Sequence, residues 1–110
     1  MGSYRVESDI VAVDPARAGS AGMGGDEGYY GYLVRELLHA TGHPSRLDRA
    51  TTGDDSTEGD DLEEGTVLAA QRIVLTEVGF PDDAVEWFTA DIGPPVDEAA
   101  ARRAAAWVLG

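Results

Sequence analysis

The residues with the clearest capacity for chemistry lie in the segment Arg35-Glu36-Leu37-Leu38-His39. In the H-E-x-x-H motif, two histidines four residues apart share one face of a helix and bind Zn²⁺, and the glutamate activates the metal-bound water. Glu36 and His39 stand in register with this motif, but Arg35 occupies the position of the first histidine. Because arginine stays protonated and offers no lone pair to a metal, the segment predicts a zinc site that lacks one ligand.

The residues around this segment carry a family resemblance. Residues 29–33 read YYGYL, and residues 40–49 read ATGHPSRLDR. Together with residues 35–39 they resemble the zincin-like metallopeptidase domain of ArdC-type antirestriction proteins, which also occurs in plasmid and phage polyvalent proteins. The family pattern is roughly YY-x-x-L-[FL]-H-E-L-x-H-x-T-G-H-x-x-R-L-x-R, and among its metal-binding and catalytic positions only the first metal histidine departs from it. Weaker similarity extends over residues 9–15, 63–70 and 86–88.

The resemblance implies a set of roles for individual residues. Position 35, His39 and a glutamate of a second helix would hold the zinc ion, and a fourth position would remain for water. Glu64 matches the family's glutamate best, and Glu63, one residue away, stays open as the alternative. Glu36 would be the general base. With Arg35 present, two ligands remain and a cation lies where the metal would sit, which argues against hydrolysis because two cations in one small pocket repel each other.

The sequence leaves two other arrangements of these residues open. His39 and His43 are themselves four residues apart and, with Glu64, would form a displaced ligand set. Alternatively, His43 is a helix-terminal side chain favoured by the macrodipole, and His39 is a half-buried histidine bonded to Glu36 or Glu64.

Arg35 has its own alternatives. Its guanidinium would pair with Glu64 or Glu36 where a metal once neutralised them, since the planar fork of arginine matches a carboxylate. Otherwise Arg35 is a solvent-exposed side chain.

The charge limits the classes of partner. The chain has 21 acidic residues against 8 basic ones, a net charge of −13, and no cysteine. Nucleic-acid-binding proteins usually carry a basic patch, so we expect no direct binding of nucleic acid. An acidic surface either serves solubility or meets a basic protein partner. No signal pattern and no apolar run of membrane-spanning length is visible, so we expect a cytoplasmic protein without membrane contact.

The pattern of apolar residues predicts one domain over residues 1–110, a length that supports a single core. We assign no structure to residues 1–3, expect a β element from two short strands, and expect a long helix capped by Asp26 and ended near Gly42. An acidic, mobile loop is expected at 50–61, and Trp107 is expected to fix the last helix in the core. The remaining segments are a loop at 16–25, strands at 4–6 and 10–13, and helices at 61–78, 82–90 and 99–109.

The expected fold class is therefore α+β and mostly helical, a zincin-like domain with a small N-terminal β element, a motif helix, a second helix that carries Glu64, and two C-terminal helices. The expected function is that of a degenerate domain without catalysis or cofactor, which binds a protein partner in a mobile-element or phage anti-defence setting. The alternative is an active zinc peptidase that uses His39, His43 and Glu64 as ligands and Glu36 as general base.

Overall fold

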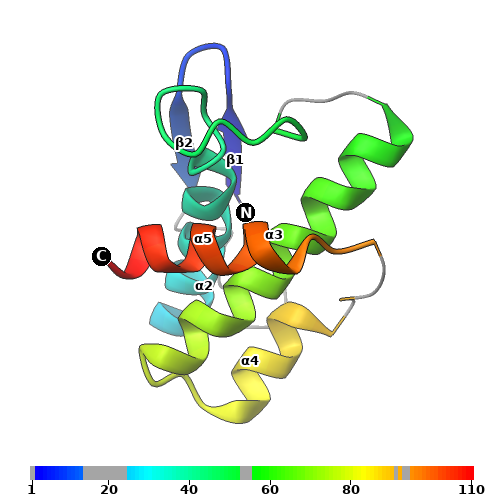
Figure 1. The fold of residues 1–110 in the computed structure, drawn as a ribbon. Helices are drawn as coiled ribbons and strands as arrows, with labels where there is room; N and C mark the ends of the chain where they lie inside the picture. Colours follow the sequence, from blue (N-terminus) through cyan, green and yellow to red (C-terminus); the bar gives the residue numbers. More distant parts are fainter. Residues whose placement is uncertain (1, 14–24, 53–55, 91, 93–94) are drawn as a thin grey trace.

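The structure, a computed structural model, describes residues 2–13, 25–52, 56–90, 92 and 95–110 (Figure 1). These residues form a two-stranded sheet and four helices, so the expected α+β, mostly helical class is confirmed. None of the four described helices combines the length and the apolar composition that a membrane span requires. The elements are β1 (Gly2–Arg5), β2 (Ile10–Val13), α2 (Gly25–Ala40), α3 (Thr57–Glu77), α4 (Asp82–Thr89) and α5 (Glu98–Leu109).

The predicted β element is an antiparallel hairpin. Its register pairs Gly2 with Val13 and Arg5 with Ile10. β1 begins at Gly2, so two of the three residues to which the sequence analysis assigned no structure belong to the sheet. Both strands lie against α2. The hairpin therefore covers one side of the helix that carries the motif residues.

The core forms where α3 crosses between the other helices. α3 contacts α2, α4 and α5 (Figure 1). α5 contributes alanines to this core, and their small side chains let it lie close to α3. The buried cluster consists of Leu38, Val67, Ala70, Val74, Ala101, Ala104 and Ala105.

A second contact region joins α2 to α4 through aromatic rings. The Tyr32 ring meets the Phe88 ring edge to face at 5.3 Å between centroids. A Cβ on Gly31 would collide with the Phe88 ring. The fully buried Gln71 of α3 donates from Nε2 to the Gly31 carbonyl at 3.0 Å. This region fixes the N-terminal half of α2, so the motif residues one turn further on are held in a defined position.

The predicted start of the second helix and the predicted loop before it are partly wrong. α3 begins at Thr57, so residues 57–61 are helical, while residues 53–55 of the predicted loop lie outside the described residues. Ser56 caps the helix by accepting a hydrogen bond from the Gly59 backbone N–H at 3.1 Å. Glu58 and Asp60 lie in the first turn, where negative charge is favoured by the helix dipole. The acidic residues that suggested a loop therefore stabilise the start of a helix.

The first helix also differs in detail from its prediction. α2 begins at Gly25, so Asp26 lies inside the helix and is not its N-cap. Of the loop predicted at residues 16–25, all residues except Gly25 lie outside the described residues. α2 ends at Ala40, so His43 lies beyond the helix.

The role expected for Trp107 is wrong. Its side chain is 52% exposed, and α5 is instead held in the core by its alanines. A large ring would separate α5 from α3, whereas a row of alanines permits close contact.

The close contact between α3 and the segment before α5 gives a testable prediction. A Cβ on Gly65 would collide with the Pro95 carbonyl, which is backbone and cannot rotate away. Gly65→Ala would stabilise an isolated helix by about 1 kcal/mol, whereas the collision should cost about 1–3 kcal/mol, so we expect a net destabilisation of up to about 2 kcal/mol. Urea denaturation measures it. The exposed change Thr76→Ala on the same helix serves as control, and a more stable Gly65→Ala protein would contradict the packing described.

Candidate functional site

The candidate site lies between α2 and α3. Arg35 and His39, one turn apart on α2, face the adjacent carboxylates Glu63 and Glu64 of α3. The helical spacing places Arg35 and His39 on one face. The structure thus brings together Arg35, His39 and Glu64, three of the residues that the sequence analysis assigned to the site, and also Glu63, which the sequence analysis kept as the alternative to Glu64.

Arg35 forms an ion pair with Glu64. Its terminal Nη2 donates to Oε1 of Glu64, and the two side chains are 35% and 38% exposed. The Arg35 Nε is buried and has no hydrogen-bond partner among the described residues. Of the two carboxylates that the sequence offered as partners for Arg35, Glu64 is the one that the guanidinium contacts.

His39 lies between the two glutamates. Its Nδ1 is 2.8 Å from Oε2 of Glu63, and its Nε2 is 3.7 Å from Oε2 of Glu64. An ionised carboxylate only accepts hydrogen bonds, so Nδ1 carries the hydrogen and donates to Glu63. In metal sites a histidine is commonly oriented in this way, with one ring nitrogen bonded to a carboxylate and the other directed at the metal. Here Nε2 is directed towards the carboxylate that Arg35 neutralises.

Glu63 is the most heavily bonded side chain of the site. It is 5% exposed and accepts hydrogen bonds from Arg49 Nε at 2.8 Å, Arg49 Nη2 at 2.9 Å, His39 Nδ1 and the Thr51 hydroxyl at 2.9 Å. Burial alone raises the pKa of Glu63, but the hydrogen bonds and charges of Arg49 and His39 outweigh it and lower the pKa to about 2. Glu63 is therefore ionised at any physiological pH.

Arg49 connects this carboxylate to the end of α2. Besides its two bonds to Glu63, it donates to the Thr41 hydroxyl at 3.1 Å and to the Leu38 carbonyl at 3.2 Å. The Thr41 hydroxyl in turn donates to the Leu38 carbonyl at 2.5 Å. Carbonyls at the end of a helix lack intrahelical partners, and cationic side chains satisfy them well. Arg49 thus ends α2 and ties it to α3.

Gly42 is required by the same arrangement. A Cβ at this position would collide with the Thr52 hydroxyl and lie 2.9 Å from the Arg49 Nη2. Thr41, Gly42 and Arg49 belong to the segment on which the family resemblance depends. In this structure all three serve the packing of the chain after α2. Sequence analysis missed the Arg49–Glu63 pair, although an arginine in the motif and a second acid beside Glu64 were its visible signs.

His43 is turned to a different part of the molecule. Its Nδ1 lies 2.8 Å from the Ser45 hydroxyl and accepts from the Ser45 backbone N–H at 3.1 Å. His39, His43 and Glu64 therefore do not converge, and within residues 2–13, 25–52, 56–90, 92 and 95–110 no three histidine or acidic side chains are arranged to hold a metal. The displaced ligand set would require His43 to leave this turn.

Glu36 is buried beside the site. It is 7% exposed, and burial raises its pKa, while the charges of His39 and Arg35 oppose the rise. Among the described residues no group donates a hydrogen bond to its carboxylate. A raised pKa suits a general base, but the neighbouring side chains do not fit a catalytic zinc ion. The groups placed to act as metal ligands are His39 Nε2 and the Glu64 carboxylate. The Glu64 carboxylate, however, already pairs with the guanidinium of Arg35.

Arg46 holds the turn after α2 to the hairpin and to α5. It donates to Asp9 at 2.7 and 3.0 Å and to the Ala40 carbonyl at 3.0 Å, and its guanidinium carbon lies 5.9 Å from the centroid of the Trp107 ring. The hydrogen bond from Arg46 lowers the pKa of Asp9. Arg46, like Arg49, is a motif residue with a structural role that the sequence alone did not reveal.

Comparisons with known proteins add no relative to this picture. No family model matches the chain, and neither the curated proteins nor the solved structures include a match.

The pairing of Glu63 predicts a specific dependence of stability on pH. Since its pKa is lower in the folded chain than the ordinary value of 4.5, its contribution is fully present above pH 4.5 and is lost as the pH falls towards 2. The contribution is on the order of 3 kcal/mol. Glu63→Gln should lower stability at pH 7 by about 3 kcal/mol, because it leaves the Arg49 charge unpaired, and should remove this part of the acid dependence. Urea denaturation from pH 3 to pH 7 measures both.

Glu64→Gln is the matched control for that experiment, because Glu64 is adjacent and its side chain is 38% exposed. It should retain most of the acid dependence. Equal pH profiles for Glu63→Gln and the unaltered protein would contradict the role assigned to Glu63.

The Arg35–Glu64 pair gives a second prediction. A double-mutant cycle with Arg35→Met and Glu64→Gln should give a coupling of about 1 kcal/mol, since solvent screens a pair that is about one third exposed. The same cycle with Glu36→Gln should give a smaller term, because Glu36 is influenced by the Arg35 charge without a hydrogen bond to it. A coupling free energy near zero between Arg35 and Glu64 would mean that their contact does not stabilise the packing of α2 against α3.

Proposed function

We propose that this chain is a non-catalytic, protein-binding domain built on a zincin-like helix pair, in which the guanidinium of Arg35 takes the place of the metal ion. The observation that carries the proposal is the contact of Arg35 with one oxygen of Glu64, while Nε2 of His39 lies 3.7 Å from the other oxygen. A histidine nitrogen and a glutamate are the ligands that a zincin-type site would supply to zinc.

Several physical arguments support a non-catalytic role. A zinc peptidase acts through a metal-bound water whose pKa the metal lowers. A guanidinium does not bind water in that way, because it has no vacant coordination position and carries only hydrogen-bond donors. It would also repel an incoming Zn²⁺ ion. The buried Glu36 would then have no activated water to deprotonate.

The charge of the chain supports a protein as the binding partner. A net charge of −13 attracts a basic protein surface over long range and disfavours nucleic acid. The proposed setting, interference with host defence by a mobile element or phage, rests on the resemblance of residues 29–49 to antirestriction proteins.

The active peptidase of the alternative would use His39, His43 and Glu64 as ligands. It would require His43 to break its contacts with Ser45 and to approach α2 from beyond the helix end. We therefore prefer the non-catalytic proposal.

Replacing Arg35 tests this proposal. After dialysis against a weak chelator, the unaltered protein should hold no stoichiometric zinc and should not cleave a denatured protein substrate with zinc added. Arg35→His should complete a His₂Glu set, bind about one zinc ion per chain and gain a zinc-dependent rise in melting temperature, since a ligand of the folded state stabilises it. Metal analysis and thermal denaturation measure the two effects.

Arg35→Gln is the matched control, because it removes the same charge without supplying a ligand, and it should not bind zinc. One tightly held zinc ion in the unaltered protein would overturn the proposal. Absence of zinc binding by a folded Arg35→His protein would show that position 35, His39 and Glu64 do not form a ligand set.

A further inference from the structure

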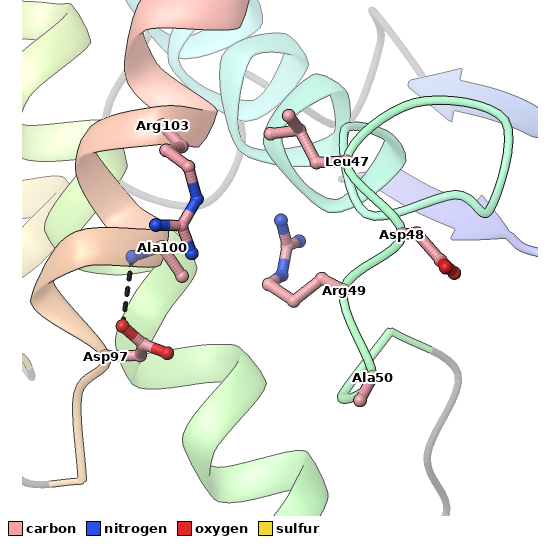
Figure 2. A pocket seen from close by; sticks show the side chains of 7 residues that line it. All are labelled: Leu47, Asp48, Arg49, Ala50, Asp97, Ala100 and Arg103. Carbon is pink, nitrogen blue, oxygen red and sulfur yellow. Dashed lines mark hydrogen bonds between the residues drawn. The ribbon is translucent and has the colours of Figure 1, made fainter.

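A pocket of about 210 Å³ lies between the chain after α2 and the first turns of α5 (Figure 2). It is smaller than the roughly 300–1,000 Å³ of typical small-molecule sites, so it suits a single side chain or a chain terminus. Its walls come from residues 47–50 on one side and from one face of α5 on the other. The lining residues are Leu47, Asp48, Arg49, Ala50, Asp97, Ala100 and Arg103.

The two arginines of this pocket differ in what they already bind. Arg49 is paired with Glu63 through two hydrogen bonds, so its charge is neutralised within the protein. Arg103 lies at the α5 wall, as Figure 2 shows. Its guanidinium has no ion pair or hydrogen bond to any other residue in the described part of the chain. Arg35, Arg46, Arg49 and Arg72 each have a carboxylate partner. Arg103 is therefore a cation that remains available to a ligand.

The two acidic residues of the pocket leave room for an anion. The carboxylate of Asp48 points away from the space between Arg49 and Arg103 (Figure 2). Asp97 is the N-cap of α5, and its Oδ1 accepts from the Ala100 backbone N–H at 3.0 Å. A carboxylate at this position interacts favourably with the positive end of the helix dipole, which reduces its repulsion of another anion.

The wall formed by residues 47–50 is held in shape by the chain itself. Asp48 adopts a φ of 50°, which is uncommon for a residue other than glycine. Its N–H donates to the His43 carbonyl at 3.1 Å, and the Arg49 N–H donates to the Gly42 carbonyl at 3.0 Å. A pocket whose wall is already ordered loses less entropy when a ligand binds.

We propose that this pocket binds a carboxylate on a short aliphatic stem, presented by the protein partner of the domain. Arg103 would bind the carboxylate, and Leu47, Ala50 and Ala100 would contact the stem. The inference rests on the proposed binding function, and it adds a determinant of specificity. On an acidic protein an arginine that lines a pocket and has no carboxylate partner among the described residues fixes the register of a basic partner, which must carry one carboxylate opposite it.

Titration of the ¹⁵N-labelled protein with short peptides tests the proposal. One peptide carries a glutamate and an amidated C-terminus, a second carries glutamine and a free C-terminal carboxylate, and a third carries glutamine and an amidated C-terminus. At least one of the first two should shift the Ala50 and Ala100 amide resonances, and the third should not. The active peptide identifies the source of the carboxylate. Equal shifts with the uncharged peptide, or no shifts with any peptide, would overturn the proposal.

Variants then assign the contact to individual residues. Arg103→Gln should weaken binding about tenfold, since a hydrogen bond to a charged group is lost. Arg102→Gln, an exposed neighbour on α5 outside the pocket lining, removes the same charge and should change affinity by less than about twofold. Equal losses of affinity in both variants would mean that the peptide responds only to the overall charge of the protein, and would overturn the proposed site. Thermal denaturation verifies that both variants fold.

The variant Asp97→Asn distinguishes whether the pocket binds a carboxylate or a cationic ligand. Asparagine is as good an N-cap as aspartate, so α5 should remain intact while one negative charge is removed. Carboxylate binding should strengthen by about twofold to threefold; weaker binding would mean that the pocket takes a cation. Zinc content tests the proposed function, and this titration tests the pocket, so either can fail without the other.

Discussion

The ion pair between Arg49 and Glu63 is the interaction on which the helix pair depends. It is buried, bidentate and extended by Thr41, Thr51 and His39, so removing either charge would leave the other without compensation in a poorly solvated place. The pair also ends α2 and closes the turn after it. The orientation of His39 follows from it, because the Glu63 carboxylate accepts a hydrogen bond from Nδ1 and leaves Nε2 to face Glu64.

The two adjacent glutamates of α3 have different roles because successive helical residues point about 100° apart. Glu63 faces the end of α2 and is enclosed by Arg49. Glu64 faces Arg35 and retains contact with solvent. The sequence analysis expected a metal ligand at one of the two from a family resemblance, and the structure distinguishes the two glutamates by burial and by partner.

The sequence allowed the fold class, two short N-terminal strands and the number of described helices to be predicted, because these follow from local periodicity. The proximity of Arg35, His39 and Glu64 was expected from the family resemblance, with Glu36 left open as the partner of Arg35. The sequence did not reveal the Arg49–Glu63 pair, since Arg49 lies in the chain after α2 and Glu63 in α3, and residues fourteen positions apart in sequence meet only in the folded chain. The exposure of Trp107 was missed because a large aromatic residue usually indicates the buried face of a helix, whereas here the small alanines of α5 form that face. The start of α3 was misplaced because acidic residues after a serine serve a helix N-terminus as well as a loop.

The Arg49–Glu63 pair has a consequence for how such a chain changes over evolutionary time. In a domain whose two helices are joined only by a bound metal, losing a ligand also threatens folding, and selection removes the variant. Here a separate contact, built without position 35, already joins the helices. Substitutions at position 35 would therefore leave this contact intact, so the helix pair should stay folded while the surface around position 35 changes and new binding is selected.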